Sequence, residues 1–321
     1  MEIRKIGIIG TGKVAVSFAT LLLRKGFQVA FFGRTEGAAV EAAAKTSSLL
    51  STNLAAATLS GEDTQSIAYP IVFATTDALV DWCDAVGFVV TDGAIAEVAR
   101  SLRHNRNRYV FHMSGSLSTT VFESQEASGL PWSAAFSLHP LKSFAKPEAD
   151  FDQIYFALEL SPLNSQESNR SIERFVGELT TLAVKLDSEQ KVLYHASAVI
   201  ASNLFVALLH YANRQLRSIG IEREDLLWPL VDSTLKNMKR FGVDASLTGP
   251  IARGDVATVE SHLHALDPEQ IDIYCSLSRE ALELSNADPK QKEAIAALLS
   301  RAIASDSEDA LADSKEAGEE K

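Results

Sequence analysis

The chain contains little cysteine, only two residues in 321. Cys83 and Cys275 are isolated in the sequence, so they form neither the close spacing of a metal site nor a disulfide framework. Low cysteine content fits a reducing compartment. We therefore expect a cytoplasmic protein that has no metal site and no disulfide.

Long hydrophobic runs are also missing. No segment approaches the ~18 uninterrupted apolar residues of a membrane-spanning helix. The apolar run near the N-terminus is short and is broken by glycines. The sequence therefore predicts neither a membrane span nor a secretory signal peptide.

The chain has few positive charges. It contains 30 lysines and arginines but 42 acidic residues, which gives a net charge of −12. Nucleic acids and anionic membrane surfaces attract basic proteins, so we expect this chain to bind neither. Residues 305–321 hold seven acids and two lysines, and so contribute −5 of the −12. Because this segment has almost no large apolar side chain, we predict a disordered, solubilising tail.

The chain does contain a dinucleotide fingerprint. An apolar run over 5–9 meets Gly10 and Gly12, and a helical pattern containing Ala15 follows, which is the strand–turn–helix context that the motif requires. Gly10 permits the tight turn, Gly12 lets the backbone approach a pyrophosphate, and Ala15 lets the helix pack closely on the strand. The pyrophosphate is expected at the helix N-terminus, where free N–H groups and the dipole favour an anion. The predicted cofactor loop comprises Gly10, Thr11, Gly12, Lys13 and Val14.

The residues that follow the second predicted strand, 28–32, indicate whether the cofactor is NADP or NAD. NAD-binding domains usually place Asp or Glu there, whereas this chain has Gly33, Arg34 and Thr35. A guanidinium binds a 2′-phosphate bidentately, and no carboxylate is present to repel it. We therefore predict NADP, with Arg34 and Thr35 as further cofactor-binding residues. The alternative is that Arg34 is only a solvated loop residue and Glu36 caps the next helix.

The pattern of elements predicts an α/β fold of two domains, as the length also favours. Short apolar runs alternate with helical segments up to residue 160, and the chain is almost wholly helical after residue 187. We predict a Rossmann domain over 1–160, a mostly α-helical domain over 161–304 and the tail over 305–321. The predicted strands are 5–9, 28–32, 71–74, 85–90, 109–112, 133–138 and 155–160. The predicted helices are 13–25, 95–102, 165–182, 188–218, 223–241, 256–265, 268–285 and 289–304, whereas 46–68 shows no clear period.

Three loops are candidates for substrate binding, because substrates of such proteins usually lie between the domains, beyond the carboxyl ends of the strands. Ser114 follows the fifth strand and offers a hydroxyl and backbone N–H groups to an anion, unless it belongs to an ordinary turn. His139 lies at the end of the sixth predicted strand. It is predicted to contact the substrate, and the alternative is that it is a structural histidine. Thr248 and Arg253 lie in a loop between helices, where Arg253 could clamp a carboxylate. Asp255 is predicted as the N-cap of the next helix.

The long helix from residue 188 carries the strongest polar pattern. Lys191, His195, Val199 and Asn203 are spaced by four and so lie on one face, with Ser202 nearby and Tyr194 beside His195. Reduction of a carbonyl by a nicotinamide needs a proton donor and a group that orients the oxygen. We predict His195 as the donor, Lys191 as the second choice and Asn203 as the orienting group. Alternatively, these polar residues only satisfy the backbone of neighbouring loops.

The chain resembles a bacterial family that joins a Rossmann-like NADP-binding domain to a C-terminal domain of unknown function. The matching segments lie between about residues 3 and 285; they are 10–15, 33–35, 114–115, 137–141, 194–203 and 247–255. This family is similar to β-hydroxyacid dehydrogenases, 6-phosphogluconate dehydrogenase, ketopantoate reductase and pyrroline-5-carboxylate reductase. The resemblance implies a helical C-terminal domain like that of 6-phosphogluconate dehydrogenase, and a homodimer formed through it.

Ketopantoate reductases place a Lys and then Asn residues at spacings of four on the first long helix of the second domain. This chain has His195 in the Lys position, Val199 in place of the middle Asn, and Asn203 in the last. The resemblance therefore implies an NADP-dependent oxidoreductase acting on a small 2-oxo or hydroxy acid, with ketopantoate as the leading candidate. Reduction of a cyclic imine, a non-catalytic NADP(H) sensor or scaffold, and a reduced deazaflavin as hydride partner stay open as alternatives.

Overall fold

The structure is a computed structural model and describes residues 2–60, 69–102, 107–123, 131–149, 154–223, 225–267 and 270–319. The chain divides into two compact units, Met1–Phe205 and Val206–Lys321. Each unit is described by itself.

The first unit is built on an eight-stranded sheet, with the order β3-β2-β1-β4-β5-β6-β7-β8. Its strands are β1 (Lys5–Ile9), β2 (Gln28–Phe32), β3 (Ile71–Val72), β4 (Ala85–Phe88), β5 (Tyr109–His112), β6 (Ala134–Pro140), β7 (Phe156–Leu160) and β8 (Ala183–Lys185). All neighbours are parallel except β6 and β7. The order 3-2-1-4-5-6 is that of a doubly wound dinucleotide-binding sheet, which brings the loops after the parallel strands to one edge.

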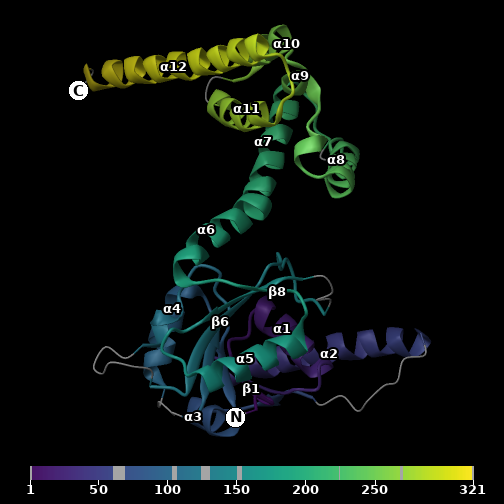
Figure 1. Cartoon of the computed structure of the whole chain (residues 1–321), viewed down its shortest axis with the longest axis vertical. Coiled ribbons are helices and arrows are strands. Elements are labelled where there is room, and N and C mark those ends of the chain that lie inside the picture. Colours follow the sequence, from purple (N-terminus) through teal and green to yellow (C-terminus); the bar gives the residue numbers. More distant parts are fainter. Residues whose placement is uncertain are drawn as a thin grey trace. The chain divides into compact units, whose positions relative to one another are not determined.

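Helices cover both faces of this sheet, as Figure 1 shows. One face packs against α1 (Lys13–Arg24), α2 (Glu36–Ser60) and α5 (Gln166–Leu179). The other packs against α3 (Thr76–Trp82), α4 (Asp92–Ser101) and the short 3₁₀-helix η1 (Thr119–Phe122). The strands can be apolar on both faces because both are buried; in β5, for example, Phe111 joins the first core and Val110 the second.

The first unit extends beyond residue 160, where the sequence places the domain boundary. The reason is that β7 is joined by β8, a three-residue strand that is too short to show a period, so the sheet continues past residue 160. Within the segment that has no clear period, residues 46–60 belong to α2, and 61–68 lie outside the described residues.

The predicted long helix 188–218 is present but is not regular throughout. It comprises α6 (Ser188–Val199), a π-helical turn η2 (Ile200–Leu204) and α7 (Phe205–Ser218). Asp187 caps α6 in a reciprocal capping box with Gln190. By length and composition this stretch could cross a membrane, a test that core helices of soluble proteins also pass. This helical stretch also contains the polar residues Lys191, His195 and Asn203.

The second unit is helical. It contains most of α7 together with α8 (Trp228–Phe241), the short η3 (Asp244–Ser246), α9 (Gly249–Arg253), α10 (Val256–Ala265), α11 (Ile271–Leu284) and α12 (Pro289–Glu319). Its core lies between α10, α11 and α12, around Val259, Cys275 and Leu299. As predicted, Asp255 is the N-cap of α10 and accepts the Thr258 N–H (3.1 Å).

The helix α12 extends into the acidic tail. It runs to Glu319 and therefore includes most of the acidic segment, for which the sequence predicts disorder. Alanine, glutamate and lysine are good helix formers. The earlier turns of α12 are anchored by the buried Ile295 and Leu299, so the helix can propagate from a packed beginning.

The two fingerprint glycines make a matched test of the β1–α1 turn. Gly10 has φ of +126°, and a Cβ there would lie 2.1 Å from the Val89 carbonyl oxygen, whereas Gly12 has φ of −75° and open space around it. We expect Gly10→Ala to lower the free energy of unfolding by on the order of 3 kcal/mol or more, because both strain and overlap act on backbone. Gly12→Ala should change it by less than about 1 kcal/mol. Urea denaturation followed by circular dichroism measures the free energy of unfolding of each variant. Equal losses in the two variants would contradict the different roles of Gly10 and Gly12 in the β1–α1 turn.

Candidate active site

The fingerprint glycines lie at the carboxyl edge of the parallel strands. Gly10 donates its N–H to the Phe32 carbonyl (3.0 Å), which joins the turn after β1 to the end of β2. The backbone of Gly12 faces open space, and no described side chain caps the start of α1. Bonding within the helix begins with the Val16 N–H, which donates to the Gly12 carbonyl (3.0 Å). The loop of Thr11, Gly12, Lys13 and Val14 therefore presents first-turn amides to an anion.

The end of β2 lies against this loop. Gly33 is buried, and a Cβ there would come within 2.9 Å of Thr11 Cγ2, so the two turns are in contact. Arg34 leaves β2 next to that contact and is exposed. Thr35 is also exposed, and its hydroxyl accepts the Ala38 N–H (3.3 Å) at the start of α2. Arg34 is thus placed where a guanidinium could bind a 2′-phosphate, while Thr35 already has a capping role.

The hydroxyl of Ser114 serves its own loop after β5. It donates to Asp92 Oδ2 (2.8 Å) and accepts the N–H groups of Ser116 (3.2 Å) and Leu117 (3.0 Å). Ser116 also donates to Asp92 Oδ2 (3.0 Å). The Ser114 hydroxyl therefore has a structural role in this loop, and its predicted contact with a substrate stays a prediction.

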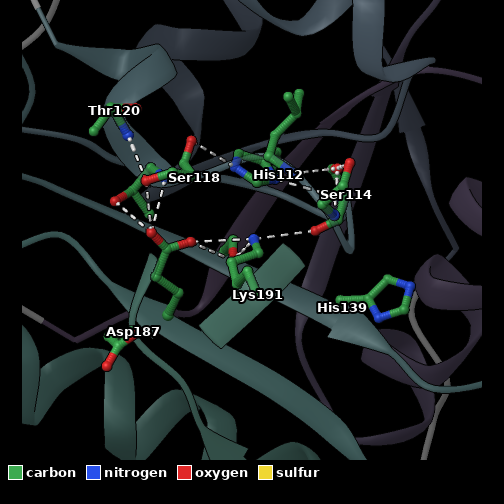
Figure 2. Close-up of polar contacts among 12 residues, drawn as sticks. His112, Ser114, Ser118, Thr120, His139, Asp187 and Lys191 are labelled. Carbon is green, nitrogen blue, oxygen red and sulfur yellow. Dashed lines mark hydrogen bonds and ion pairs between the residues drawn. The ribbon is translucent and has the colours of Figure 1, made fainter. Parts of the chain in front are cut away.

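Lys191 is placed in the interior, although the sequence predicts it as a proton donor. Its side chain is 2% exposed, and the ammonium has three acceptors: Ser137 Oγ (2.6 Å), Glu159 Oε2 (3.1 Å) and the Ser114 carbonyl (3.3 Å). Figure 2 shows this network. Since an ammonium has three hydrogens, this arrangement leaves none for a substrate. The geometry makes Lys191 the link between α6, two strands and the β5 loop.

Glu159, on β7, completes the buried network. Its Oε1 accepts hydrogen bonds from the Ser118 hydroxyl (2.8 Å) and the Thr119 N–H (3.1 Å). Burial alone raises the pKa of Glu159, but the Lys191 ammonium and these hydrogen bonds outweigh it and hold the pKa below its ordinary value. Burial lowers the pKa of Lys191, and the charge of Glu159 offsets only part of that effect.

Three aromatic rings meet beside Gly115. The ring of His139, at the end of β6, lies edge-to-face against Tyr194 (centroids 5.7 Å apart) and against His195 (5.9 Å). The Nδ1 of His139 lies 3.0 Å from the Tyr194 hydroxyl oxygen. A Cβ at Gly115 would come within 2.5 Å of His195 Nδ1 and 3.0 Å of the His139 ring, so only glycine fits.

The imidazoles at the sheet edge differ in their surroundings. Burial, with help from the neighbouring His195 and Lys191, lowers the pKa of His139 to about 4, so this ring is neutral at physiological pH. Burial likewise lowers the pKa of His112 to about 4. The Nδ1 of His195 is buried and has no hydrogen-bond partner among the described residues. A buried unpaired nitrogen is costly, and the His195 ring that carries it lines the pocket described next.

A pocket of about 560 Å³, hereafter the α6 pocket, adjoins these rings in the first unit. It is lined by His139, Leu141, Lys142, Ser143, Tyr194, His195, Ser197, Ala198, Val199, Ala201, Ser202 and Asn203. The π-turn η2 supplies the last three; such turns occur frequently at functional sites. The Ser202 hydroxyl lies 2.7 Å from the Ala198 carbonyl and 2.9 Å from Asn203 Oδ1, so it can donate to either.

The remaining predicted residues, Thr248 and Arg253, belong to the second unit and are described there. Thr248 precedes α9 and Arg253 ends it, and both are exposed. Gly254 follows as the C-cap with φ of +70°, and this left-handed backbone ends α9. Their predicted contact with a substrate carboxylate stays a prediction.

Several residues of the site have no role in the sequence-based prediction. Glu159 and Asp92 hold the loops, Gly115 leaves room for the imidazoles, and Tyr194 lines the pocket. For Glu159 a signal exists, since a lone carboxylate in the apolar strand Phe156–Leu160 must be paired if buried. The pairing itself crosses 32 residues of chain and cannot be read from spacing.

Comparison with known families gives this arrangement a context. Residues 155–281 match the model of a domain of unknown function, DUF2520. A search of curated proteins finds no match.

Solved structures extend the likeness to most of the chain. A candidate NADP oxidoreductase from Bacteroides fragilis is 25% identical, with a TM-score of 0.65 over 88% of this chain and 98% of its own. Protein TM1727 from Thermotoga maritima is 26% identical, with a TM-score of 0.58 over 87% and 98%. A reductive aminase from Aspergillus terreus, solved with NADPH and ethyl-5-oxohexanoate, is similar in fold at 13% identity, with a TM-score of 0.56 over 95% of both chains.

These comparisons confirm the fold class and the resemblance inferred from the sequence: a Rossmann domain followed by a helical region with a domain of unknown function. NADP, the cofactor predicted from the sequence, is also the cofactor named for the B. fragilis protein, and NADPH is bound in the aminase structure.

The buried ion pair makes a sharp test of how α6 is held. Lys191→Met leaves the Glu159 carboxylate uncompensated, so we expect a loss of about 3–5 kcal/mol in the free energy of unfolding. Adding Glu159→Leu should recover part of that loss, because both charges are then gone. Urea denaturation of the single and double variants provides the measurement. A single variant as stable as the starting protein would show that the pair does not hold the helix.

Proposed function

We propose that this protein is an NADP(H)-dependent oxidoreductase that reduces a C=O or C=N group of a small substrate bound in the α6 pocket. The observation that carries the proposal is that a dinucleotide cradle and this pocket lie at one sheet edge. Gly10 packs against Val89, which follows β4, and Gly115, which follows the neighbouring β5, packs against His195. Ligands of doubly wound sheets bind at this edge.

The residues of the cradle fit NADP. The open space at Gly12 and the first-turn amides of α1 suit a pyrophosphate, and the exposed Arg34 suits a 2′-phosphate. Loop 10–14, Arg34 and Thr35 would hold the cofactor, which supplies a hydride when bound. Among the described residues no acidic side chain is paired with Arg34, so its guanidinium is available.

His195 and Asn203 supply the polar groups of this proposal. With Nδ1 of His195 buried against Gly115, its Nε2 gives a proton to the substrate atom that receives charge. The Asn203 amide orients that atom, and the Ser202 hydroxyl beside Oδ1 favours presentation of the amide nitrogen. Lys191 contributes by holding α6 in place rather than by donating a proton.

A small 2-oxo acid, with ketopantoate first, is the proposed substrate, and Thr248 and Arg253 are kept as the proposed carboxylate-binding residues. A cyclic imine is the second candidate, and one observation favours it. Lys142, the cation on the pocket wall, is 2.7 Å from the Glu148 carboxylate, so its charge is already compensated. A neutral wall suits an imine that carries no carboxylate.

A homodimer in the cytoplasm is the state we propose for the working enzyme. Large apolar side chains of the second unit are exposed; they include Val206, Ile219, Trp228, Leu230, Phe241 and Val243. Such a surface is typical of an interface that is buried in an assembly. The net charge of −12 supports the absence of nucleic acid and anionic membranes among the partners.

The decisive experiment is oxidation of NADPH, followed at 340 nm, with ketopantoate and with 1-pyrroline as separate substrates. Turnover that depends on the concentration of either substrate supports the reductase and identifies its class. Binding of NADPH, shown by fluorescence, without turnover on any oxo acid or imine would favour a sensor or scaffold.

The Arg34→Ala variant tests the cofactor assignment. We expect its affinity for NADPH to fall by about 1.5–3 kcal/mol, because a charge-assisted contact is lost, and its affinity for NADH to stay nearly unchanged. Fluorescence titration with both dinucleotides measures the difference. The exposed Arg223, paired with Asp225 in the second unit, provides the control Arg223→Ala. Equal losses of affinity for NADPH and NADH would show that Arg34 does not bind the 2′-phosphate.

The His195→Ala variant tests the proton donor. We expect kcat and kcat/KM to fall together by about 10²-fold or more, with the affinity for NADPH nearly normal. Steady-state kinetics with the active substrate, combined with the fluorescence titration, gives both quantities. An unchanged kcat would exclude His195 as the general acid.

A further inference from the structure

The hydroxyl of Tyr194 has no role in the proposed reaction so far, yet it lies on the wall of the α6 pocket. Its oxygen is 3.0 Å from Nδ1 of His139, and the two rings meet edge-to-face at 86°. Tyr194 directly precedes His195 on α6, and the ring of His139 is in edge-to-face contact with both. One imidazole thus positions two neighbouring polar side chains that line the same pocket.

The orientation of the Tyr194 hydroxyl depends on where His139 carries its hydrogen. His139 is neutral, so only one of its nitrogens is protonated. A hydrogen on Nδ1 finds the Tyr194 oxygen as acceptor, whereas the structure gives Nε2 no acceptor within the described part of the chain. Either atom can donate in this hydrogen bond, and with the hydrogen on Nδ1 the Tyr194 oxygen is the acceptor. The O–H of Tyr194 is then free to donate into the pocket.

We propose that Tyr194 is a further catalytic residue, whose hydroxyl, oriented by His139, donates a hydrogen bond to the substrate oxygen or nitrogen that becomes more basic during reduction. This inference rests on the proposed reductase function. His195 delivers the proton to that atom, and Tyr194 lowers the barrier by stabilising the charge before the proton arrives. His139 touches Tyr194 and acts through it, so it is a positioning residue.

Burial supports a hydrogen-bonding role for Tyr194 rather than proton loss. Burial raises the pKa of Tyr194 to about 12, so the hydroxyl keeps its hydrogen throughout the physiological range. A donor that is fixed in advance needs no reorganisation during the reaction, which is where such groups gain their effect. Gly115 contributes to this arrangement of rings, because a side chain at that position would displace both His139 and His195.

The test compares Tyr194→Phe with a matched control, Tyr69→Phe, at an exposed tyrosine in the first unit. We expect Tyr194→Phe to lower kcat by about 100-fold with NADPH affinity unchanged, as for removal of one preorganised donor, and Tyr69→Phe to have no effect. His139→Leu should lower kcat similarly, and His139→Asn, whose amide can replace Nδ1–H, should restore part of it. In the Tyr194→Phe background, His139→Leu should add little, because His139 acts through Tyr194.

A measurement that does not depend on turnover separates this inference from the proposed function. Nitrogen-15 NMR of the histidine rings should show His139 as the neutral Nδ1–H tautomer, with an Nδ1 shift that changes in Tyr194→Phe but not in Tyr69→Phe. If the starting protein reduces neither substrate, the proposed function fails whatever the NMR shows. If it is active, a normal kcat in Tyr194→Phe, a matching loss of NADPH affinity, or the Nε2–H tautomer overturns the role of Tyr194.

Discussion

The ion pair between Lys191 and Glu159 is the interaction on which the arrangement of the site depends. Both side chains are buried (2% and 3% exposed), which is tolerable only if every charge is compensated and every hydrogen is accepted. The ammonium meets this condition through Glu159, Ser137 and the Ser114 carbonyl. Because these groups come from β7, β6 and the loop after β5, one side chain fixes the start of α6 against three parts of the sheet edge.

This anchor sets the positions of the residues that follow it on the helix. His195 lies one turn after Lys191, and Tyr194 lies beside His195, so both are carried to His139 at the end of β6. The contact is close enough to exclude a Cβ at Gly115. Gly10 has the same relation to the Val89 carbonyl, which follows the neighbouring strand β4. The site is therefore shaped as much by two missing side chains as by the polar groups that line it.

The sequence predicts well those features that depend on neighbouring residues. The turn at Gly10 and Gly12, the position of Arg34 and the cap at Asp255 are local, so spacing and residue type suffice. The spacing by four also places Lys191 on the face of His195, but it does not indicate how deeply a side chain is buried, and Lys191 is buried. Its partner Glu159 is distant in sequence.

The departures from the predicted helices have physical reasons that a period does not reveal. A π-turn inserts one extra residue per turn and brings Ala201, Ser202 and Asn203 to the pocket, although the apolar pattern of α6 and α7 continues without a break. The acidic tail has too few apolar residues to form a core, yet its helix-forming residues extend a helix that is already anchored. In both cases the neighbouring turns contribute to the conformation together with the residues themselves.

The electrostatics of the pocket favour dipoles over net charge. Lys191 is compensated by Glu159, Lys142 by Glu148, and His139 is neutral because burial and the adjacent His195 disfavour a charge on it. Charge that forms on a substrate atom would then meet oriented N–H and O–H groups of the pocket wall. Fixed dipoles stabilise such charge without attracting a competing anion. A pocket lined in this way accommodates a carbonyl or an imine equally well. Selection of a substrate that carries a carboxylate would need a cation that is not part of the pocket lining.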